Sequence, residues 1–245
     1  MKLLLIGAGN MGEAMLKGLQ KYDISVVEAN EKRREELKKA YKNVVFLGAM
    51  PDIEPYILIL AIKPQSLQKL QVKGRAKGLI SILAGVDLKT LKEKIQAKYY
   101  IRAMPNMAAL KQKSATSLCG DEELKKDAIS VLESIGKCFW LQSEDELDIA
   151  MALAGCAPAW LALVAEALSD GAVNLGLKRD LSFKMLASLF EGVGATLQDV
   201  HPAILKDRVT SPKGTTIAGY KALEKGSVRN AFLEAMEEAY GRAKK

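Results

Sequence analysis

Residues 2–12 read Lys2-Leu3-Leu4-Leu5-Ile6-Gly7-Ala8-Gly9-Asn10-Met11-Gly12, an apolar strand that leads into the pattern G-x-G-x-x-G. In this pattern the first glycine permits a tight turn, the second lets the backbone approach a pyrophosphate, and the third lets the next helix pack closely on the strand. An amphipathic stretch at 13–19 follows as the expected helix, whose free N–H groups attract an anion. An ordinary strand-to-helix turn is the alternative. We predict a dinucleotide site at Ile6, Gly7, Ala8, Gly9, Asn10, Met11 and Gly12.

The first half of the chain alternates strand-like and helix-like segments. Strands are predicted near 3–6, 25–29, 44–47, 57–62, 78–83 and 99–103, with helices such as 32–41 and 88–96 between them. Two further strands, 114–119 and 138–141, flank a predicted helix at 122–135. This alternation is typical of an α/β fold, and we expect a Rossmann-type doubly wound, mainly parallel sheet.

From about residue 143 nearly every segment has a helical pattern, at 144–153, 157–176, 180–199, 202–209, 215–223 and 228–242. The first of these helices are apolar around much of their circumference, which the surface of a monomer would not tolerate. We therefore expect them to form the core of a subunit interface. The sequence predicts a dinucleotide-binding Rossmann domain at 1–145 and an all-helical dimerisation and substrate domain at 146–245.

The composition is that of a folded protein, because 49% of the 245 residues are hydrophobic. The longest uncharged stretch, 149–165, contains Gly155 and Pro158 and falls short of the ~20 apolar residues of a membrane span. It is predicted to be a buried helix. The N-terminal apolar run leads into the glycine turn rather than a cleavage site, so we expect a cytoplasmic protein without a membrane partner.

The net charge of +7 is spread along the chain, and aromatic residues make up only 6% of it. A basic surface without a stacking motif argues against a nucleic-acid partner and suits an anionic small molecule. Cys119, Cys138 and Cys156 are too scattered for a disulfide framework. His201 is the single histidine, which excludes a multi-histidine metal site, and its neighbour Pro202 favours a structural role for it.

The end of the second predicted strand, at 28–34, is the place where this fold meets the adenosine ribose. An acidic side chain there favours NAD, whereas a small polar residue followed by basic ones favours NADP. Glu28 lies 21 residues after Gly7, a spacing that fits NAD, yet Asn30, Lys32 and Arg33 fit a phosphate. We predict NADPH as the cofactor, with NADH as the alternative; the basic residues could also simply begin an exposed helix.

Two further strand ends are expected at the ligand crevice, because residues beyond the carboxyl ends of parallel strands face it. Ala61, Ile62, Lys63 and Pro64 follow one buried strand and should lie along the cofactor. Asn106 follows the next, and its amide could orient a nicotinamide carboxamide or the substrate. The alternative for Pro64 is that it only ends the strand.

A polar loop, Val209-Thr210-Ser211-Pro212-Lys213-Gly214-Thr215-Thr216, opens a helix inside the apolar second half. Hydroxyls and backbone N–H groups at a helix start form a concavity that binds a carboxylate. Ser211 or Thr215 could instead be a simple N-cap. The number of hydroxyls exceeds what capping needs, so we favour a binding site.

Six motifs follow one another along the chain: GAGNMG at 7–12, AIKPQ at 61–65, RAMPN at 102–106, AGCAPAW at 154–160, HPAILKDRVTSPKGTT at 201–216 and LE at 223–224. In this order they resemble the pyrroline-5-carboxylate reductase family over essentially the whole chain. The blocks at 154–160 and 201–216 carry the specificity, because the glycine motif alone would fit many dehydrogenase families.

The resemblance implies an NAD(P)H-dependent reduction of 1-pyrroline-5-carboxylate to L-proline, the last step of proline biosynthesis, in a helical homodimer that could assemble further. It also implies that Ser211, Gly214 and Thr215 hold the substrate carboxylate. Thr216 would place its hydroxyl at the ring nitrogen and is the implied catalytic residue. Hydride attack on an imine requires positioning, an anion cradle and a proton, without a nucleophile or a metal.

The chain departs from the family pattern at six positions. Met107 and Ala108 stand where the family pattern M-P-N-T-P has threonine and proline. Ala154, Cys156 and Trp160 replace the two serines and the tyrosine of S-G-S-x-P-A-Y. Lys213 replaces the first glycine of S-P-G-G-T-T. These changes bear on rate or substrate range more than on the class of reaction.

Two other functions remain open. A related imine reductase or a β-hydroxyacid-type dehydrogenase shares the two-domain plan, but such dehydrogenases use a helix lysine as general acid. The stretch 171–177 offers Asn174 and no lysine. A non-catalytic nucleotide-sensing homologue is the other alternative, and the intact Ser211, Thr215 and Thr216 argue against it.

Overall fold

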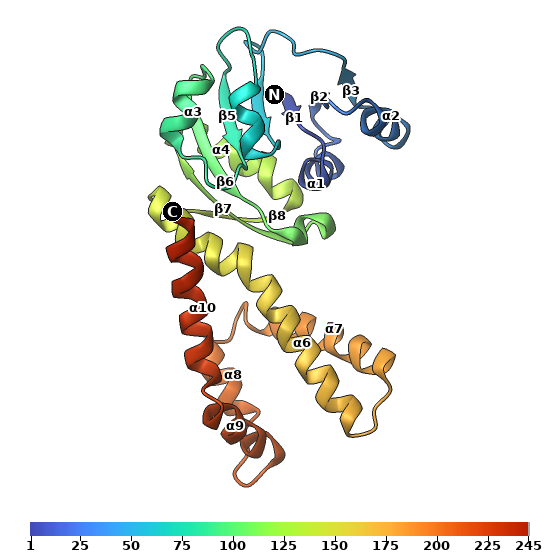
Figure 1. Cartoon of the computed structure of the whole chain (residues 1–245), viewed down its shortest axis with the longest axis vertical. Helices are drawn as coiled ribbons and strands as arrows, with labels where there is room; N and C mark the ends of the chain where they lie inside the picture. Colours follow the sequence, from blue (N-terminus) through green and yellow to red (C-terminus); the bar gives the residue numbers. More distant parts are fainter. Residues whose placement is uncertain (245) are drawn as a thin grey trace. The chain divides into compact units, whose positions relative to one another are not determined.

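The computed structural model describes residues 1–244, and its first half is built on an eight-stranded sheet (Figure 1). The strands are β1 (Lys2–Ile6), β2 (Asp23–Val27), β3 (Val45–Leu47), β4 (Ile57–Leu60), β5 (Gly78–Ser81), β6 (Tyr100–Met104), β7 (Ser114–Gly120) and β8 (Gly136–Trp140). Their order is β3-β2-β1-β4-β5-β6-β7-β8, and neighbouring strands are parallel except for β6 and β7. This is the doubly wound, mainly parallel sheet that the alternating sequence predicts.

Helices cover both faces of this sheet (Figure 1). They are α1 (Asn10–Gly18), α2 (Glu31–Ala40), α3 (Leu88–Lys94) and α4 (Glu122–Leu132), with three short 3-10 helices, η1 (Pro64–Lys69), η2 (Met107–Lys111) and η3 (Glu133–Ile135). Successive side chains of a strand point to opposite faces of the sheet, and those of β1 enter two different core clusters. Leu3 and Leu5 join the cluster that contains residues of α1 and α4. Leu4 and Ile6 join the cluster that contains residues of α3 and η1, so β1 is buried on both sides.

The antiparallel pairing of β6 and β7 brings Arg102 opposite Cys119. A parallel pair needs a crossover of about a dozen residues or more, usually a helix. The connection from Met104 to Ser114 holds only η2 and is shorter than that. The chain therefore turns back, and β7 and β8 extend the sheet in the reversed direction.

The second half is helical throughout. The helix that starts as α5 (Glu144–Ala150) continues through a π-helical segment, η4 (Met151–Cys156), into α6 (Ala157–Asn174). It is followed by α7 (Arg179–Thr196), α8 (Pro202–Arg208), α9 (Thr215–Lys225) and α10 (Val228–Ala243). Contacts divide the chain into a first unit of residues 1–155 with the C-terminal end, and a second unit of residues 156–242.

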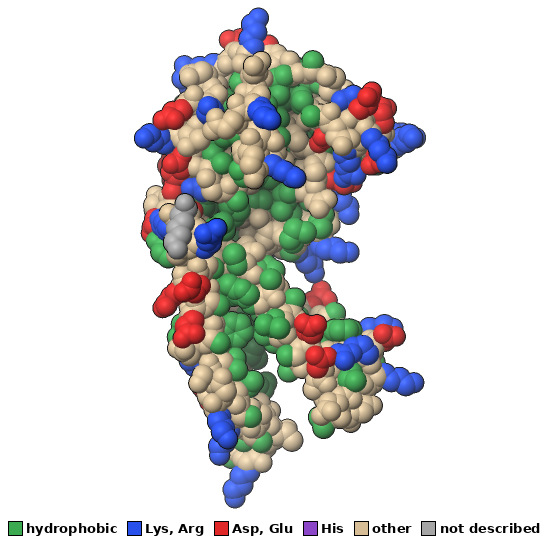
Figure 2. Space-filling view, in the orientation of Figure 1, with side chains coloured by type: hydrophobic (Ala, Val, Ile, Leu, Met, Phe, Trp, Pro, Cys, Tyr) green, Lys and Arg blue, Asp and Glu red, His purple; other side chains and the backbone are tan. Residues whose placement is uncertain are grey.

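Within the second unit, α6 and α7 pack against each other, and their contact includes a buried hydrogen bond of 2.5 Å between Ser169 and Ser182. Most other side chains of these helices are exposed. Leu161 and Leu163 of α6 are 50% and 64% exposed, and α7 exposes Phe183 among others. Hydrophobic side chains are accordingly gathered on the visible surface of the helical half (Figure 2).

The prediction of a buried helix at 149–165 is therefore wrong for the single chain. Only 11% of the most apolar window of the helix Glu144–Asn174 is buried. By length and composition alone this helix could cross a membrane, which the shorter uncharged stretch of the sequence did not indicate. The core helix of a soluble protein passes the same test, and the apolar surface of α6 and α7 is what an interface between subunits requires.

Candidate active site

The glycine loop between β1 and α1 has the conformation that a dinucleotide requires. Gly7 has φ +93°, and a Cβ there would lie 2.7 Å from the carbonyl oxygen of Ala61. A Cβ at Gly12 would collide with the carbonyl oxygen of Gly7. Gly9 faces open space, with no atom within 4 Å of the position of a Cβ. The loop is therefore closely packed at its first and third glycines and open at its second, where a pyrophosphate approaches.

Gly9 is also the N-cap of α1 and has no side chain to cap the helix. The N–H groups of the first turn remain available to an anion, and the helix dipole adds a partial positive charge at the same place. The fit between this loop and a pyrophosphate is thus a matter of backbone shape and backbone donors.

A pocket of about 490 Å³ opens beside the loop. It lies at the carboxyl ends of β1, β2 and β4 and is lined by Ile6, Gly7, Gly9, Val27, Glu28, Ala29, Met50, Ala61, Ile62, Lys63, Ser66, Lys69 and Leu70. Most of the lining is apolar, with two lysines and one carboxylate. Such a lining suits a ligand that combines flat rings with anionic groups.

Six of the residues predicted to bind the cofactor line this pocket: Ile6, Gly7, Gly9, Ala61, Ile62 and Lys63. The other nine, Ala8, Asn10, Met11, Gly12, Asn30, Lys32, Arg33, Pro64 and Asn106, do not line it. Ala8 is fully buried, and Gly12 packs closely against the carbonyl group of Gly7. Pro64 is the first residue of η1, which fits the alternative that it ends the strand segment.

Asn30 and Arg33 have structural partners in the described residues. The side chain of Asn30 caps α2 by accepting from the Arg33 backbone N–H at 3.0 Å. The Arg33 guanidinium forms an ion pair with Glu13 and donates to the carbonyl oxygen of Ala8 at 3.3 Å. Burial alone would lower the pKa of Arg33, but the hydrogen bonds and charges of Glu13 and Glu36 raise it overall.

Tyr41 belongs to the same group of side chains, since its hydroxyl donates to Glu13 at 3.4 Å. Burial and the negative charge of Glu13 raise the pKa of Tyr41 above its ordinary value. The opposite charges of Glu13 and Arg33 offset each other, and together with Tyr41 these side chains link α1 to α2.

Asn106 uses its amide within the protein. Its Oδ1 accepts from the Ala108 backbone N–H at 3.1 Å and so caps η2. Its Nδ2 donates to the carbonyl oxygen of Ala154 at 2.9 Å. The side chain therefore fastens the π-helical segment η4 to the end of β6, and this is the role that the structure gives it.

The polar turn 209–216 forms the start of α9 in the second unit. Its N-cap is Gly214, and no side chain caps the helix. Ser211, Thr215 and Thr216 are exposed, and a Cβ at Gly214 would collide with the Ser211 hydroxyl. None of these three hydroxyls caps α9, so the alternative that Ser211 or Thr215 is a simple N-cap does not hold.

His201 and Lys213 have identifiable conformational roles near this turn. His201 is the N-cap of α8, and its Nδ1 accepts from the Ala203 backbone N–H at 3.3 Å, as its neighbour Pro202 suggests. Lys213 has φ +61°, a left-handed conformation that favours glycine. A lysine therefore occupies a backbone position whose geometry suits the glycine of the resembled pattern.

Seven lining residues are not among the predicted cofactor-binding residues, although Glu28 is the alternative that favours NAD: Val27, Glu28, Ala29, Met50, Ser66, Lys69 and Leu70. Glu28 carries a signal in its spacing from Gly7, and Val27 and Ala29 adjoin it at the end of β2. Ser66, Lys69 and Leu70 come from η1 and its end, a short helix after Pro64 that has no periodic signal.

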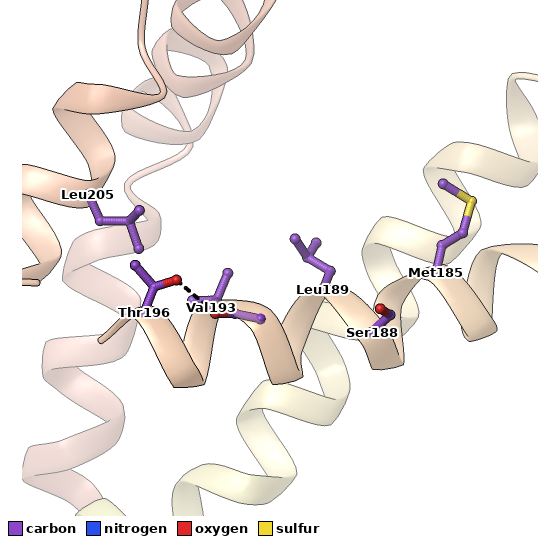
Figure 3. Close-up of a pocket in the computed structure, with 7 residues that line it drawn as sticks. Met185, Ser188, Leu189, Val193, Thr196 and Leu205 are labelled. Carbon is purple, nitrogen blue, oxygen red and sulfur yellow. Dashed lines mark hydrogen bonds between the residues drawn. The ribbon is translucent and has the colours of Figure 1, made fainter. Parts of the chain in front are cut away.

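A second hollow, of about 550 Å³, lies between α7 and α8 (Figure 3). Met185, Leu189, Val193 and Leu205 form its apolar lining, and the Thr196 hydroxyl donates to the Gly192 carbonyl oxygen at 2.9 Å. The one threonine hydroxyl of the lining is therefore used within its own helix. This hollow offers apolar surface rather than reactive groups.

Both halves of the chain match known families. Residues 2–85 match the family described as NADP oxidoreductase coenzyme F420-dependent, and residues 144–245 match the one described as pyrroline-5-carboxylate reductase dimerisation. The pyrroline-5-carboxylate reductase of Helicobacter pylori is 32% identical over 248 residues, which cover 97% of this chain and 96% of the relative.

Two solved structures resemble the chain over nearly its whole length. A pyrroline-5-carboxylate reductase from Coxiella burnetii has a TM-score of 0.86 at 28% identity and covers 99% of this chain and 97% of its own. The pyrroline carboxylate reductase of Plasmodium falciparum, with NADP bound, has a TM-score of 0.79 at 26% identity and covers 100% and 97%.

Proposed function

The chain belongs to the pyrroline-5-carboxylate reductase family, and we propose that it catalyses the reduction of 1-pyrroline-5-carboxylate to L-proline with NADPH, the last step of proline biosynthesis. The observation that carries this proposal is the 32% identity to a pyrroline-5-carboxylate reductase over 97% of the chain. The open glycine loop and its pocket support it independently, because a reductase of this class must bind a reduced dinucleotide.

The first unit would hold the cofactor. Gly7 and Gly9 would admit the pyrophosphate to the N-terminus of α1, and Ala61, Ile62 and Lys63 would lie along the dinucleotide at the end of β4. NADPH, when bound there, supplies a hydride to the imine carbon of the substrate. Lys63 and Lys69 add positive charge to a pocket that must accept phosphates.

The turn at the start of α9 would hold the substrate. Ser211 and Thr215, with the N–H groups beside Gly214, would donate hydrogen bonds to the substrate carboxylate. Thr216 would direct its hydroxyl to the ring nitrogen. The absence of a side-chain cap on α9 supports this assignment, because these exposed hydroxyls are left for another partner.

The chain itself would orient the two reactants and hold the ring nitrogen where it can be protonated. As the carbon–nitrogen double bond accepts a hydride at carbon, the nitrogen becomes basic and takes up one proton. The Thr216 hydroxyl would hold the nitrogen in place, and water would supply the proton. Fixing both reactants in this way replaces an encounter in solution by a positioned reaction, which is the main source of rate enhancement for such chemistry.

We further propose that the enzyme acts in the cytoplasm as a homodimer, with an assembly of dimers as the alternative, and without a nucleic-acid or membrane partner. The match of residues 144–245 to a dimerisation family and the exposed apolar side chains of α6 and α7 support the dimer. The functional division into 1–145 and 146–245 belongs to the same proposal.

The test is an assay of the purified full-length protein with 1-pyrroline-5-carboxylate and NADPH. We expect NADPH to be oxidised and L-proline to appear in equal amounts. With a small β-hydroxy acid and NADP⁺, the substrates of the alternative dehydrogenase, NADP⁺ should not be reduced to NADPH. Tight binding of NADPH without proline formation would instead indicate a nucleotide-sensing protein and overturn the proposal.

A further inference from the structure

The carboxylate of Glu28 occupies the place in the cofactor pocket where the adenosine ribose binds in this fold. Glu28 directly follows β2 and lines the pocket with Gly7 and Gly9. Its Oε2 accepts from the Ala8 backbone N–H at 2.7 Å, and its Oε1 accepts from the Asn30 backbone N–H at 2.8 Å. Both oxygens are thus fixed by backbone donors, and the half-buried side chain has little freedom to move aside.

The two arginines that follow Glu28 are engaged by groups of the protein itself. Arg33 is paired with Glu13 and lies 3.6 Å from Glu36. Arg34 donates to the backbone carbonyl oxygen of Glu28 at 3.0 Å, which places its guanidinium on the main chain rather than in the pocket. Lys32 is exposed and does not line the pocket either. None of these three cations is among the residues that line the pocket beside the Glu28 carboxylate.

The two lysines that do line the pocket, Lys63 and Lys69, come from the segment after β4. Their charge favours the anionic groups of a dinucleotide, and the pyrophosphate is common to NADH and NADPH. The two cofactors differ in structure only at the ribose 2′ position, beside which Glu28 lies. A carboxylate there accepts a hydrogen bond from a 2′-hydroxyl, whereas a 2′-phosphate brings about −1.5 to −2 charges against it.

We propose that Glu28 is a specificity-determining residue that makes the pocket prefer NADH to NADPH. The inference rests on the proposed function and concerns which of two cofactors serves that reaction better; NADPH remains a usable one. The Glu28 carboxylate would accept a hydrogen bond from the 2′-hydroxyl of NADH and repel the 2′-phosphate of NADPH.

Binding without the imine substrate tests the pocket directly. Dissociation constants of NADH and NADPH for the full-length protein are measured by titration calorimetry at one ionic strength, since salt screens the repulsion. A second pair of probes, adenosine 5′-diphosphate and its 2′-phosphorylated form, isolates the ribose position. We expect NADH and the unphosphorylated probe to bind at least tenfold more tightly than their partners.

Two variants test the residue itself. Glu28→Gln removes the charge, and NADPH should then bind roughly as well as NADH. Because Gln would set an amide NH₂ against a backbone N–H, this variant could unfold, and Ala29→Arg is the second test. Ala29 is exposed and lines the pocket, so an arginine there leaves the bonds of Glu28 intact and should tighten NADPH binding about tenfold. Glu31→Gln, an equal charge change outside the pocket, should leave the preference unchanged.

The outcomes separate the two proposals. If the wild-type protein binds NADPH as tightly as NADH, or if neither Glu28→Gln nor Ala29→Arg shifts the ratio, the inference is wrong. If NADH binds preferentially but neither cofactor is oxidised by 1-pyrroline-5-carboxylate, the proposed function fails while the assignment of Glu28 stands. Oxidation of both cofactors with a higher kcat/KM for NADH supports both.

Discussion

The buried guanidinium of Arg102 donates a hydrogen bond of 2.7 Å to the carboxylate of Glu144, which joins the middle of β6 to the start of α5. A second carboxylate, Asp148, lies 3.6 Å from the same guanidinium. Glu144 also accepts from the Leu88 backbone N–H at 2.9 Å. The sheet, α3 and the first turn of the long helix are thus held by one small network of charges.

Replacing Arg102 by Met should be strongly destabilising, because Glu144 loses the cation of its ion pair and Asp148 keeps only the more exposed Lys244. We expect the free energy of unfolding to fall by about 3 kcal/mol, the lower end for a broken buried pair, since Glu144 is partly exposed. Lys38→Met is the matched control, because Lys38 and Glu35 are also 2.7 Å apart but exposed, and its cost should stay below about 1 kcal/mol. Urea denaturation measures both, and equal losses would contradict the assignment.

The glycine loop allows stability and cofactor affinity to be separated. Gly12→Ala should lower the free energy of unfolding by about 1–3 kcal/mol, because its Cβ meets the Gly7 carbonyl oxygen. Gly9→Ala should leave stability within about 0.5 kcal/mol, since its Cβ meets nothing in the protein. It should nevertheless weaken dinucleotide binding at least tenfold, because the pyrophosphate needs that space. Undiminished affinity in Gly9→Ala would place the pyrophosphate elsewhere.

Thr216→Ala tests the proposed role of the hydroxyl at the ring nitrogen. We expect kcat to fall on the order of a hundredfold while the dissociation constant of the cofactor stays the same. Thr216→Ser, which keeps a hydroxyl, should recover most of the rate. Thr196→Ala is the control, because that hydroxyl is used by the Gly192 carbonyl oxygen within α7. Full activity of Thr216→Ala would remove Thr216 from the mechanism.

Lys213 should respond to substitution according to backbone conformation rather than charge. Its φ of +61° is unfavourable for a side chain with a Cβ and more so for a β-branched one. Lys213→Gly should raise the free energy of unfolding by up to about 1 kcal/mol, and Lys213→Val should lower it by about as much. Denaturation with urea measures the order Gly, Lys, Val, and a valine variant as stable as the wild type would exclude strain at this turn.

Asp87 should make stability depend on pH in the acidic range. It caps α3, and its hydrogen bonds from Thr90 hold its pKa below the ordinary value. Because the folded state favours the ionised form, the contribution is present above the pKa of the unfolded chain, about 3.9, and is lost as the pH falls through the lower folded value. Asp87→Asn should be less stable than the wild type at pH 7, and the difference should shrink toward pH 3.

Much of the first half could be predicted because each strand carries its own local pattern. The end of β4 beside the pocket was harder to predict, because Ala61 and Ile62 have the composition of a strand, yet β4 ends at Leu60. The direction of β7 was not visible either, since a strand has the same alternation in both directions. It follows from the short connection after Met104, which is a property of loop length rather than of residue type.

The site was predictable where backbone shape decides it and less so where distant side chains compete. The glycines of the loop line or support the pocket as their spacing indicates. The sequence gives no sign of a partner for Arg33, but the structure pairs it with Glu13, twenty residues earlier, and it does not line the pocket. Asn106 is likewise engaged by Ala154, which is far from it along the chain. Local patterns do not contain such pairings.

The exposed leucines of α6 and α7 have a thermodynamic consequence. In the proposed homodimer a second copy covers side chains such as Leu161 and Leu163, so unfolding a chain also separates it from its partner. Mass action then links the two equilibria, and a more dilute sample unfolds at a lower denaturant concentration. The stability of this protein is therefore a quantity that has a value only at a stated molarity of chains.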